Sequence, residues 1–247
     1  MKVEAVALEG IPEVAPGDDL VELIVGSAEP IGDDDVVVIA QKIVSKSEGR
    51  FCDLTAVEPT DRARELAAET EKDPAIVQLI LDESRAVLRA VPGVLIVESQ
   101  HGFVCANAGI DSSNVSGDRV LLLPIDPDSS ARRIRDGFRE RLGVAPAVII
   151  TDSFGRAWRS GQADVAIGCA GIEPLLDLRG SADSNGRDLA ATVTAVADEI
   201  AAAADLARAK ASGHPVVIVR GRGDLVRDID GSGAVAGLRE RSQDLFR

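Results

Sequence analysis

The sequence predicts a mixed α/β fold, and three observations lead to this class. Short runs rich in Val, Ile and Leu recur along the 247 residues, and most are continuous, as in strands buried on both faces. Segments with helical periodicity separate some of these runs. Other runs follow one another after only a turn, which predicts hairpins and mixed sheets rather than a regular βαβ alternation.

The strands are expected where these apolar runs lie, and turn residues bound most of them. The expected strands are 3–8, 36–39, 93–98, 104–106, 120–123, 148–151, 165–169 and 216–220. Helices are expected over 61–72, 75–86, 130–142, 187–210 and 234–245. Thr60 caps the first helix, Asp73 and Pro74 open the second, and Gly143 ends the third. No linker is visible, so we expect one domain over 1–247, or two small intertwined units.

The composition excludes several classes of partner. The 41 acidic and 27 basic residues give a formal net charge of −14, which repels nucleic acid and anionic membranes. Aromatic residues make up only 2%, so stacking platforms for bases are nearly absent. The acidic, lysine-poor composition suits a salt-rich, halophilic cytoplasm. A GC-rich genome that favours Arg and Ala over Lys is the alternative.

Common catalytic and nucleotide-binding signatures are missing. The sequence has no P-loop, and the glycine-rich stretch 231–237 lacks the dinucleotide-binding spacing. Only two histidines occur, which argues against a catalytic triad or a multi-histidine metal site. Three widely spaced cysteines predict free thiols in a reducing compartment. The N-terminal residues do not resemble a signal peptide, and no apolar run is as long as a membrane span. We therefore expect a cytoplasmic protein.

Acidic and hydroxyl side chains follow two of the expected strands. Asp111 lies past the strand 104–106, and Asp152 and Ser153 end the apolar run A-V-I-I. Such oxygen donors suit Mg²⁺ or Mn²⁺, whereas the alternative is an Asx turn or a helix cap with no ligand. For Asp111, the turn or cap without a ligand is favoured. For Asp152, the nearby Arg156 and Arg159 favour a functional interpretation.

Two further segments carry positive charge. Lys42, Lys46 and Arg50 form a local cationic island in an acidic chain, which suits phosphate binding. A strand edge protected by lysine explains them equally well. Near 207–215, Lys210 and Gly213 are sufficiently explained as residues that end a helix. Together the segments predict an enzyme site for a metal and a phosphorylated ligand, without naming the reaction.

Eight strings across the chain resemble one family, the coenzyme F(420):L-glutamate ligases. The strings are E-G-I-P, I-V-S-K-S-E-G-R, C-A-N-A-G-I-D-S-S-N, I-I-T-D-S-F-G-R-A-W-R-S-G, D-V-A-I-G-C-A-G, V-A-D-E-I-A-A-A-A, P-V-V-I-V-R-G and D-L-F-R. The resemblance implies a ligase that adds L-glutamate to the deazaflavin F(420)-0, and then a second glutamate through a γ-glutamyl bond. It implies GTP as co-substrate, an acyl phosphate intermediate, two divalent ions (Mg²⁺ or Mn²⁺) and stimulation by K⁺.

The resemblance also implies roles for individual residues. It makes Asp111 and Asp152 metal ligands, with Ser153 on a second metal, and no covalent catalytic residue is required. It assigns Arg156 and Arg159 more loosely to the phosphate of the deazaflavin or to glutamate carboxylates. The residues it assigns to GTP are Ile11, Pro12, Glu13, Val14, Gln41, Lys42, Lys46, Asn114, Ala209, Lys210, Ala211, Ser212, Gly213 and His214.

The family fold implied by the resemblance is a two-domain α/β arrangement with mixed sheets in an intertwined homodimer. The chain resembles the stand-alone, archaeal-type form, without the flavin-reductase-like domain of some bacterial relatives. Two other functions are weighed against this one. They are another GTP- or ATP-dependent carboxylate–amine ligase and a non-catalytic nucleotide-binding module.

Overall fold

A five-stranded mixed sheet lies at the centre of the computed structural model, which describes residues 1–112, 117–209 and 213–244. The strand order is β1-β12-β2-β8-β9, and only the β2–β8 pair is parallel. The mixed α/β class predicted from the sequence is therefore confirmed. The strands are β1 (Glu4–Ala7), β12 (Val216–Arg220), β2 (Val36–Ala40), β8 (Ala147–Arg156) and β9 (Arg159–Ala170).

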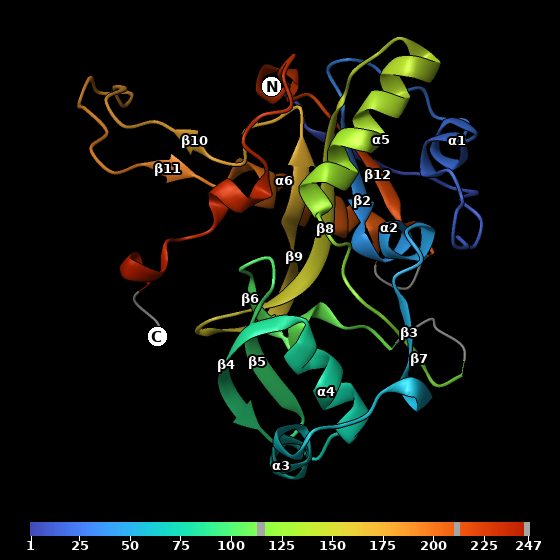
Figure 1. Ribbon diagram of the computed structural model, residues 1–247. Coiled ribbons are helices and arrows are strands. Elements are labelled where there is room, and N and C mark those ends of the chain that lie inside the picture. The colour runs from blue at the N-terminus through green and yellow to red at the C-terminus, as the bar shows by residue number, and fades with distance from the viewer. Residues whose placement is uncertain (113–116, 210–212, 245–247) are drawn as a thin grey trace.

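Helices cover both faces of this sheet (Figure 1). On one face, Val37 and Ile39 share a core with α5 (Pro127–Leu142), together with α1 (Leu20–Val25) and α2 (Gln41–Ser47). On the other face, Val36 and Val38 share a core with α6 (Val196–Arg208). Successive side chains of β2 thus enter opposite cores, which explains the continuous apolar run in the sequence.

The start of α5 packs closely against β9. Asp126 caps this helix by accepting a hydrogen bond from the Ser129 N–H at 2.9 Å, so the helix begins slightly earlier than the sequence suggested. A Cβ atom at Gly168 would lie 2.4 Å from the Pro127 carbonyl oxygen, so this contact requires glycine. Gly143 ends α5 with a φ of 71°, as predicted.

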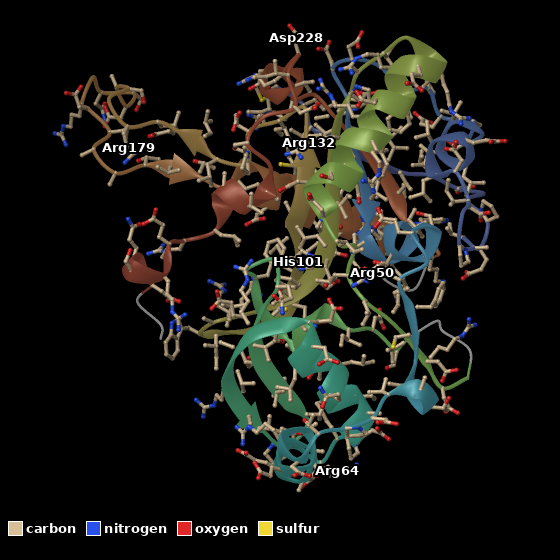
Figure 2. All side chains as sticks on the ribbon, viewed as in Figure 1. Arg50, Arg64, His101, Arg132, Arg179 and Asp228 are labelled. Carbon is tan, nitrogen blue, oxygen red and sulfur yellow. The ribbon has the colours of Figure 1, made fainter. Side chains whose placement is uncertain are left out.

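A smaller unit has its own sheet and its own core. Its antiparallel strands are β4 (Ser84–Val91), β5 (Val94–Ser99) and β6 (Val104–Ala106), and α3 (Asp61–Thr70) and α4 (Pro74–Asp82) pack on them. Thr60 and Asp73 cap the two helices, as predicted. Figure 2 shows Arg50 and His101 at the junction with the central sheet. Arg50 Nε donates to the carbonyl of Leu123 in the central core at 2.8 Å, and its Nη2 donates to Glu83 at the end of α4 at 3.2 Å, so Arg50 ties the two parts together.

The remaining elements are short and connect or extend these units. β3 (Phe51–Asp53) pairs with β7 (Arg119–Leu121), and β10 (Leu176–Asp177) pairs with β11 (Val193–Thr194) in a projecting arm. Short 3-10 turns complete the described chain, and these are Leu54–Ala56, Asn107–Gly109, Gly223–Leu225, Ala234–Gly237 and Arg241–Gln243.

Several sequence-based element predictions are wrong in detail. The helix expected over 75–86 ends at Asp82, and β4 follows it almost at once. The helix expected from 187 begins at Val196, because the preceding β-branched residues pair in the β10–β11 arm. The 120–123 run pairs with β3 rather than with its neighbour in sequence, and 234–244 forms only 3-10 turns. Across the described ranges, every helix is too short or too polar to cross a membrane.

Candidate functional site

A cleft of about 500 Å³ opens where the parallel strands β2 and β8 end. Ala40 and Thr151 are paired at these carboxyl ends, so the segments that follow them meet at one edge of the sheet. This edge is the usual ligand position in α/β sheets. Segments of the smaller unit and of α6 complete the walls, which consist of 11–14, 40–43, 105–107, 109–111, 151–155, 213–215, Lys46, Gln162, Asp164, Asp205 and Arg208.

Most residues that the resemblance assigned to GTP or metal lie on these walls. They are Ile11, Pro12, Glu13, Val14, Gln41, Lys42, Lys46, Asp111, Asp152, Ser153, Gly213 and His214. Ala209 follows the last residue of α6 and is not among the wall residues in the described part of the chain. Four other assigned residues lie outside the described ranges, and these are Asn114, Lys210, Ala211 and Ser212.

The two lysines of the cationic island enter the cleft from α2. The Nζ atom of Lys42 lies 2.7 Å from Asp111 Oδ2, and both side chains are about one-quarter exposed. Lys46 is buried and pairs with the exposed carboxylate of Glu13. Because α2 starts directly after β2, this segment is a helix on the cleft wall and not the protected strand edge weighed from the sequence.

The opposite wall carries Asp152 and a buried cluster centred on Asp164. The Asp164 side chain is only 2% exposed, and its Oδ1 accepts a hydrogen bond from Ser153 Oγ at 2.6 Å. Its Oδ2 accepts from Thr151 Oγ1 at 2.8 Å and from Arg208 Nη1 at 2.5 Å. The guanidinium therefore balances a carboxylate that would otherwise be buried as a lone charge.

The oxygen donors of this cleft fit a hard divalent cation. Asp111 and Asp152 supply carboxylates and Ser153 supplies a hydroxyl oxygen to the same cavity. No three His, Cys, Asp or Glu side chains gather into a metal-binding group within the described ranges. Mg²⁺ typically uses one or two protein carboxylates and completes its shell with water and ligand phosphates. The donor set therefore suits a cation that arrives with a phosphorylated ligand.

Backbone in the left-handed region occurs at two points beside the cleft. Asn107 and Ala108 have φ values of 53° and 54°, and Ala209 has a φ of 47° at the end of α6. Non-glycine residues adopt such angles only where the surrounding structure holds them. In the first case, Asn107 Oδ1 accepts a hydrogen bond from the Leu95 N–H at 3.2 Å, which fixes the turn that leads to Asp111.

Cys105 lies on the cleft wall but is poorly suited to be a nucleophile. Burial, reinforced by the negative charge of Asp152, raises the pKa of its thiol to about 12. The thiol therefore stays protonated at neutral pH, whereas the reactive form of cysteine is the thiolate.

The two arginines noted beside Asp152 are not wall residues of this cleft, whose wall on the β8–β9 hairpin reaches Gly155 and Gln162. Arg156 and Arg159 are exposed at the tip of the β8–β9 hairpin, and neither is a wall residue. Arg156 Nη2 donates to the Ser160 carbonyl at 3.2 Å, so it stabilises the tip. Their assignment to substrate stays a prediction.

Sequence reasoning missed the buried cluster behind Asp152. Asp164 directly precedes the expected strand 165–169 and no role is predicted for it, although a carboxylate next to an apolar run is a signal that it needs a partner. Arg208 is 44 residues further along the chain, and no spacing rule links it to Asp164.

Two lysines and a wall of oxygen donors surround one cleft, an arrangement that is typical of proteins that bind an anionic, phosphate-bearing ligand with a divalent cation. Sequence comparison makes this class specific. The chain belongs to the F(420)-0:Gamma-glutamyl ligase family, whose sequence model matches residues 10–221.

Relatives of known name extend over most of the chain. It is 49% identical over 225 residues to the coenzyme F(420):L-glutamate ligase of Haloarcula marismortui, covering 88% of this chain and 87% of the relative. It is 43% identical over 254 residues to the ligase of the same name from Methanothermobacter thermautotrophicus, with both chains covered completely. Identity to the ligase of Methanopyrus kandleri is 45% over 249 residues, covering all of this chain and 98% of the relative.

Proposed function

We propose that this protein is a GTP-dependent ligase that adds L-glutamate successively to F(420)-0, forming F(420)-1 and the γ-glutamyl-linked F(420)-2. The relatives named coenzyme F(420):L-glutamate ligase support the overall reaction. The observation that carries the proposal in the structure is the single cleft that joins Lys42 and Lys46 to Asp111, Asp152 and Ser153.

The chemistry requires an activated carboxylate. The γ-phosphoryl group of GTP passes to a carboxylate oxygen of F(420)-0, and GDP leaves. The amine of glutamate then attacks the acyl carbon, loses a proton and displaces inorganic phosphate, which gives the amide. Phosphoryl transfer of this kind depends on positioning and charge neutralisation rather than on a protein nucleophile. The protonated thiol of Cys105 is consistent with such a reaction.

Each wall of the cleft has a role in this proposal. Lys42 and Lys46 bind phosphate oxygens as point charges, and residues 11–14 and 213–214 complete the nucleotide pocket. Asp111 and Asp152 hold Mg²⁺ or Mn²⁺, and Ser153 contributes to a second ion. When bound, these ions neutralise the phosphate charge during transfer. Lys42 balances Asp111 in the structure and is well placed to exchange that partner for a phosphate.

The assembly and environment complete the proposal. We propose a cytoplasmic homodimer whose two intertwined subdomains correspond to the central sheet and the smaller unit with its separate core. We also propose stimulation by K⁺ and, from the net charge of −14, a halophilic host. Unfolding at low ionic strength supports the halophilic proposal, and a stability that is indifferent to salt contradicts it.

The test is one reaction in high KCl with purified protein, F(420)-0, L-glutamate, GTP and Mn²⁺. Mass spectrometry measures glutamyl additions, and chromatography measures GDP. The proposal predicts glutamylated coenzyme formed in step with GDP. GDP without glutamylation indicates a ligase for another acid, and the absence of both products in every salt indicates a binding module. Replacing GTP with ATP in a parallel reaction tests the nucleotide.

A further inference from the structure

The buried carboxylate of Asp164 connects two walls of the cleft but is not among the residues assigned to cation or nucleotide. It lies opposite Ser153 in the β8–β9 ladder, so the two side chains stand on the same face of the hairpin. Its other oxygen, Oδ2, accepts a hydrogen bond from Arg208, the last residue of α6. One side chain thus fixes both a cleft hydroxyl and the end of the helix that leads into residues 209–214.

The hydrogen bond to Asp164 determines what Ser153 presents to the cleft. A serine hydroxyl has one proton and two acceptor lone pairs. The proton of Ser153 is used by Asp164 Oδ1 at 2.6 Å, so the lone pairs of Oγ are left for another partner. A cation requires lone pairs, and a nearby hydrogen-bonded carboxylate also makes the hydroxyl oxygen a better donor.

The environment of Asp164 keeps this carboxylate in its place and in its accepting role. Thr151 and Asp164 are 1% and 2% exposed, and Arg208 is 9% exposed, so water has little access to the cluster. Thr151 Oγ1 donates to Asp164 Oδ2 and accepts from Arg208 Nη1 at 3.1 Å, which closes a three-residue network. The Asp164 carboxylate accepts the hydrogen bonds from Thr151, Ser153 and Arg208.

We infer that Asp164 is a positioning residue that turns the lone pairs of Ser153 Oγ toward a divalent cation and couples that cation site to the end of α6. The inference rests on the proposed role of Ser153 as a cation ligand. It predicts that Asp164 acts through Ser153, without touching the cation itself.

The decisive substitution is Asp164→Asn, because it preserves shape and reverses one hydrogen bond. The amide oxygen can still accept from Arg208 and Thr151, so the NH₂ group faces Ser153 and donates to it. The Ser153 proton must then turn into the cleft, where it opposes a cation. Loss of such supporting contacts typically lowers metal affinity about 10- to 100-fold.

The experiment titrates Mn²⁺ alone into the full chain and measures free Mn²⁺ by electron paramagnetic resonance. We expect Asp164→Asn and Ser153→Ala each to raise the Kd about tenfold or more. The double variant should bind Mn²⁺ no more weakly than the weaker-binding single variant, because both changes remove the same contribution to affinity. Asp198→Asn is the matched control, since Asp198 is a half-buried carboxylate on α6 that accepts from the Ala166 N–H and lies outside this cleft.

The outcomes separate this inference from the proposed function. Two outcomes overturn the inference about Asp164 and leave the cation assignment intact. One is a wild-type Kd for Mn²⁺ in Asp164→Asn. The other is a double variant whose Kd rises by the product of the two single increases. A wild-type chain that binds no Mn²⁺ overturns the cation assignment as well. Circular dichroism checks folding. If Asp164→Asn does not fold, Asp164→Glu provides the second test, because it keeps the charge that balances Arg208 but displaces the carboxylate from Ser153. It should raise the Kd for Mn²⁺, and a wild-type Kd would overturn the inference.

Discussion

The base and the tip of the β8–β9 hairpin both have charged residues, but these lie in different environments. At the base, Thr151 and Asp164 are 1% and 2% exposed and belong to the wall of the cleft. At the tip, Trp158 is 86% exposed and the adjacent arginines face solvent. Because a strand rises about 3.3 Å per residue, Arg156 lies roughly 13 Å further along the strand than Asp152.

This difference shows that charged residues that are close in the sequence need not lie close together in the fold. The guanidinium that reaches the Asp152 wall comes from Arg208, which is distant in sequence, and not from Arg156 or Arg159. The base is therefore expected to govern cation-dependent chemistry, and the tip to contribute at most a weak ionic contact. Four substitutions test this division.

The largest effect is expected from Asp152→Asn at the base. Charge stabilisation by a metal amounts to several kcal/mol, so losing a ligand should lower turnover on the order of a thousandfold. Steady-state kinetics with F(420)-0, glutamate and GTP measure this change. Asp177→Asn, on the exposed β10 strand, is the control. Full ligase activity in Asp152→Asn would mean that the metal assignment is wrong.

A smaller effect is expected from Lys42→Met on the facing wall. A hydrogen bond to a charged group contributes about 1.5–3 kcal/mol, so the KM for GTP should rise about tenfold or more, because binding rather than chemistry is affected first. Lys2→Met, which removes an exposed lysine that is not a wall residue of the cleft, should leave KM unchanged. An unchanged KM in Lys42→Met would remove this lysine from the nucleotide pocket.

Asp198→Asn is expected to change the pH dependence of stability and not the chemistry. Burial raises the pKa of Asp198 above its ordinary value of 3.8, although the hydrogen bond from Ala166 partly opposes the shift. The folded state therefore holds the proton more tightly, and stability is lost as pH rises from about 4 through the raised pKa. The variant lacks this loss, so the difference between its free energy of unfolding and that of wild type should increase in its favour from pH 3.5 to pH 7.

Urea denaturation at the two pH values measures this difference. If the free energies of unfolding of variant and wild type differed by the same amount at both pH values, the pKa of Asp198 would not be raised in the folded state. Cation affinity should not change in either case, because Asp198 is not a wall residue of the cleft.

The smallest effect is expected at the tip. Exposed ionic contacts contribute about 0.2–1 kcal/mol, so Arg156→Ala should raise the KM for F(420)-0 or glutamate no more than roughly fivefold. Any increase should shrink in high salt, because exposed charges are screened. No increase at low salt would remove Arg156 from the substrate site, and a loss comparable to that of Asp152→Asn would overturn the division between base and tip.

Local signals in the sequence predicted a large part of the fold. The caps Thr60, Asp73 and Gly143 mark real helix ends, because each acts within a few residues of itself. The buried strands β2 and β12 were visible as continuous valine-rich runs. The β10–β11 arm was missed, because its strands are only two residues long and depend on pairing across a long loop.

The candidate site was predicted unevenly for the same reason. Segments 11–14, 41–46 and 152–153 were found through quoted motifs, and the structure brings them to one cleft. The Thr151–Asp164–Arg208 network was not found, because it forms only when β8, β9 and α6 pack together. A rule based on spacing cannot represent a contact that tertiary packing creates.

The most direct test of the central claim is a crystal structure with Mn²⁺ and a non-hydrolysable GTP analogue, with the manganese located by anomalous diffraction. The account predicts a manganese peak at the base of the hairpin, within about 2.5 Å of a carboxylate oxygen of Asp111 or Asp152, beside the analogue's phosphates. Manganese and nucleotide bound elsewhere, with Asp111 still paired to Lys42, would contradict it.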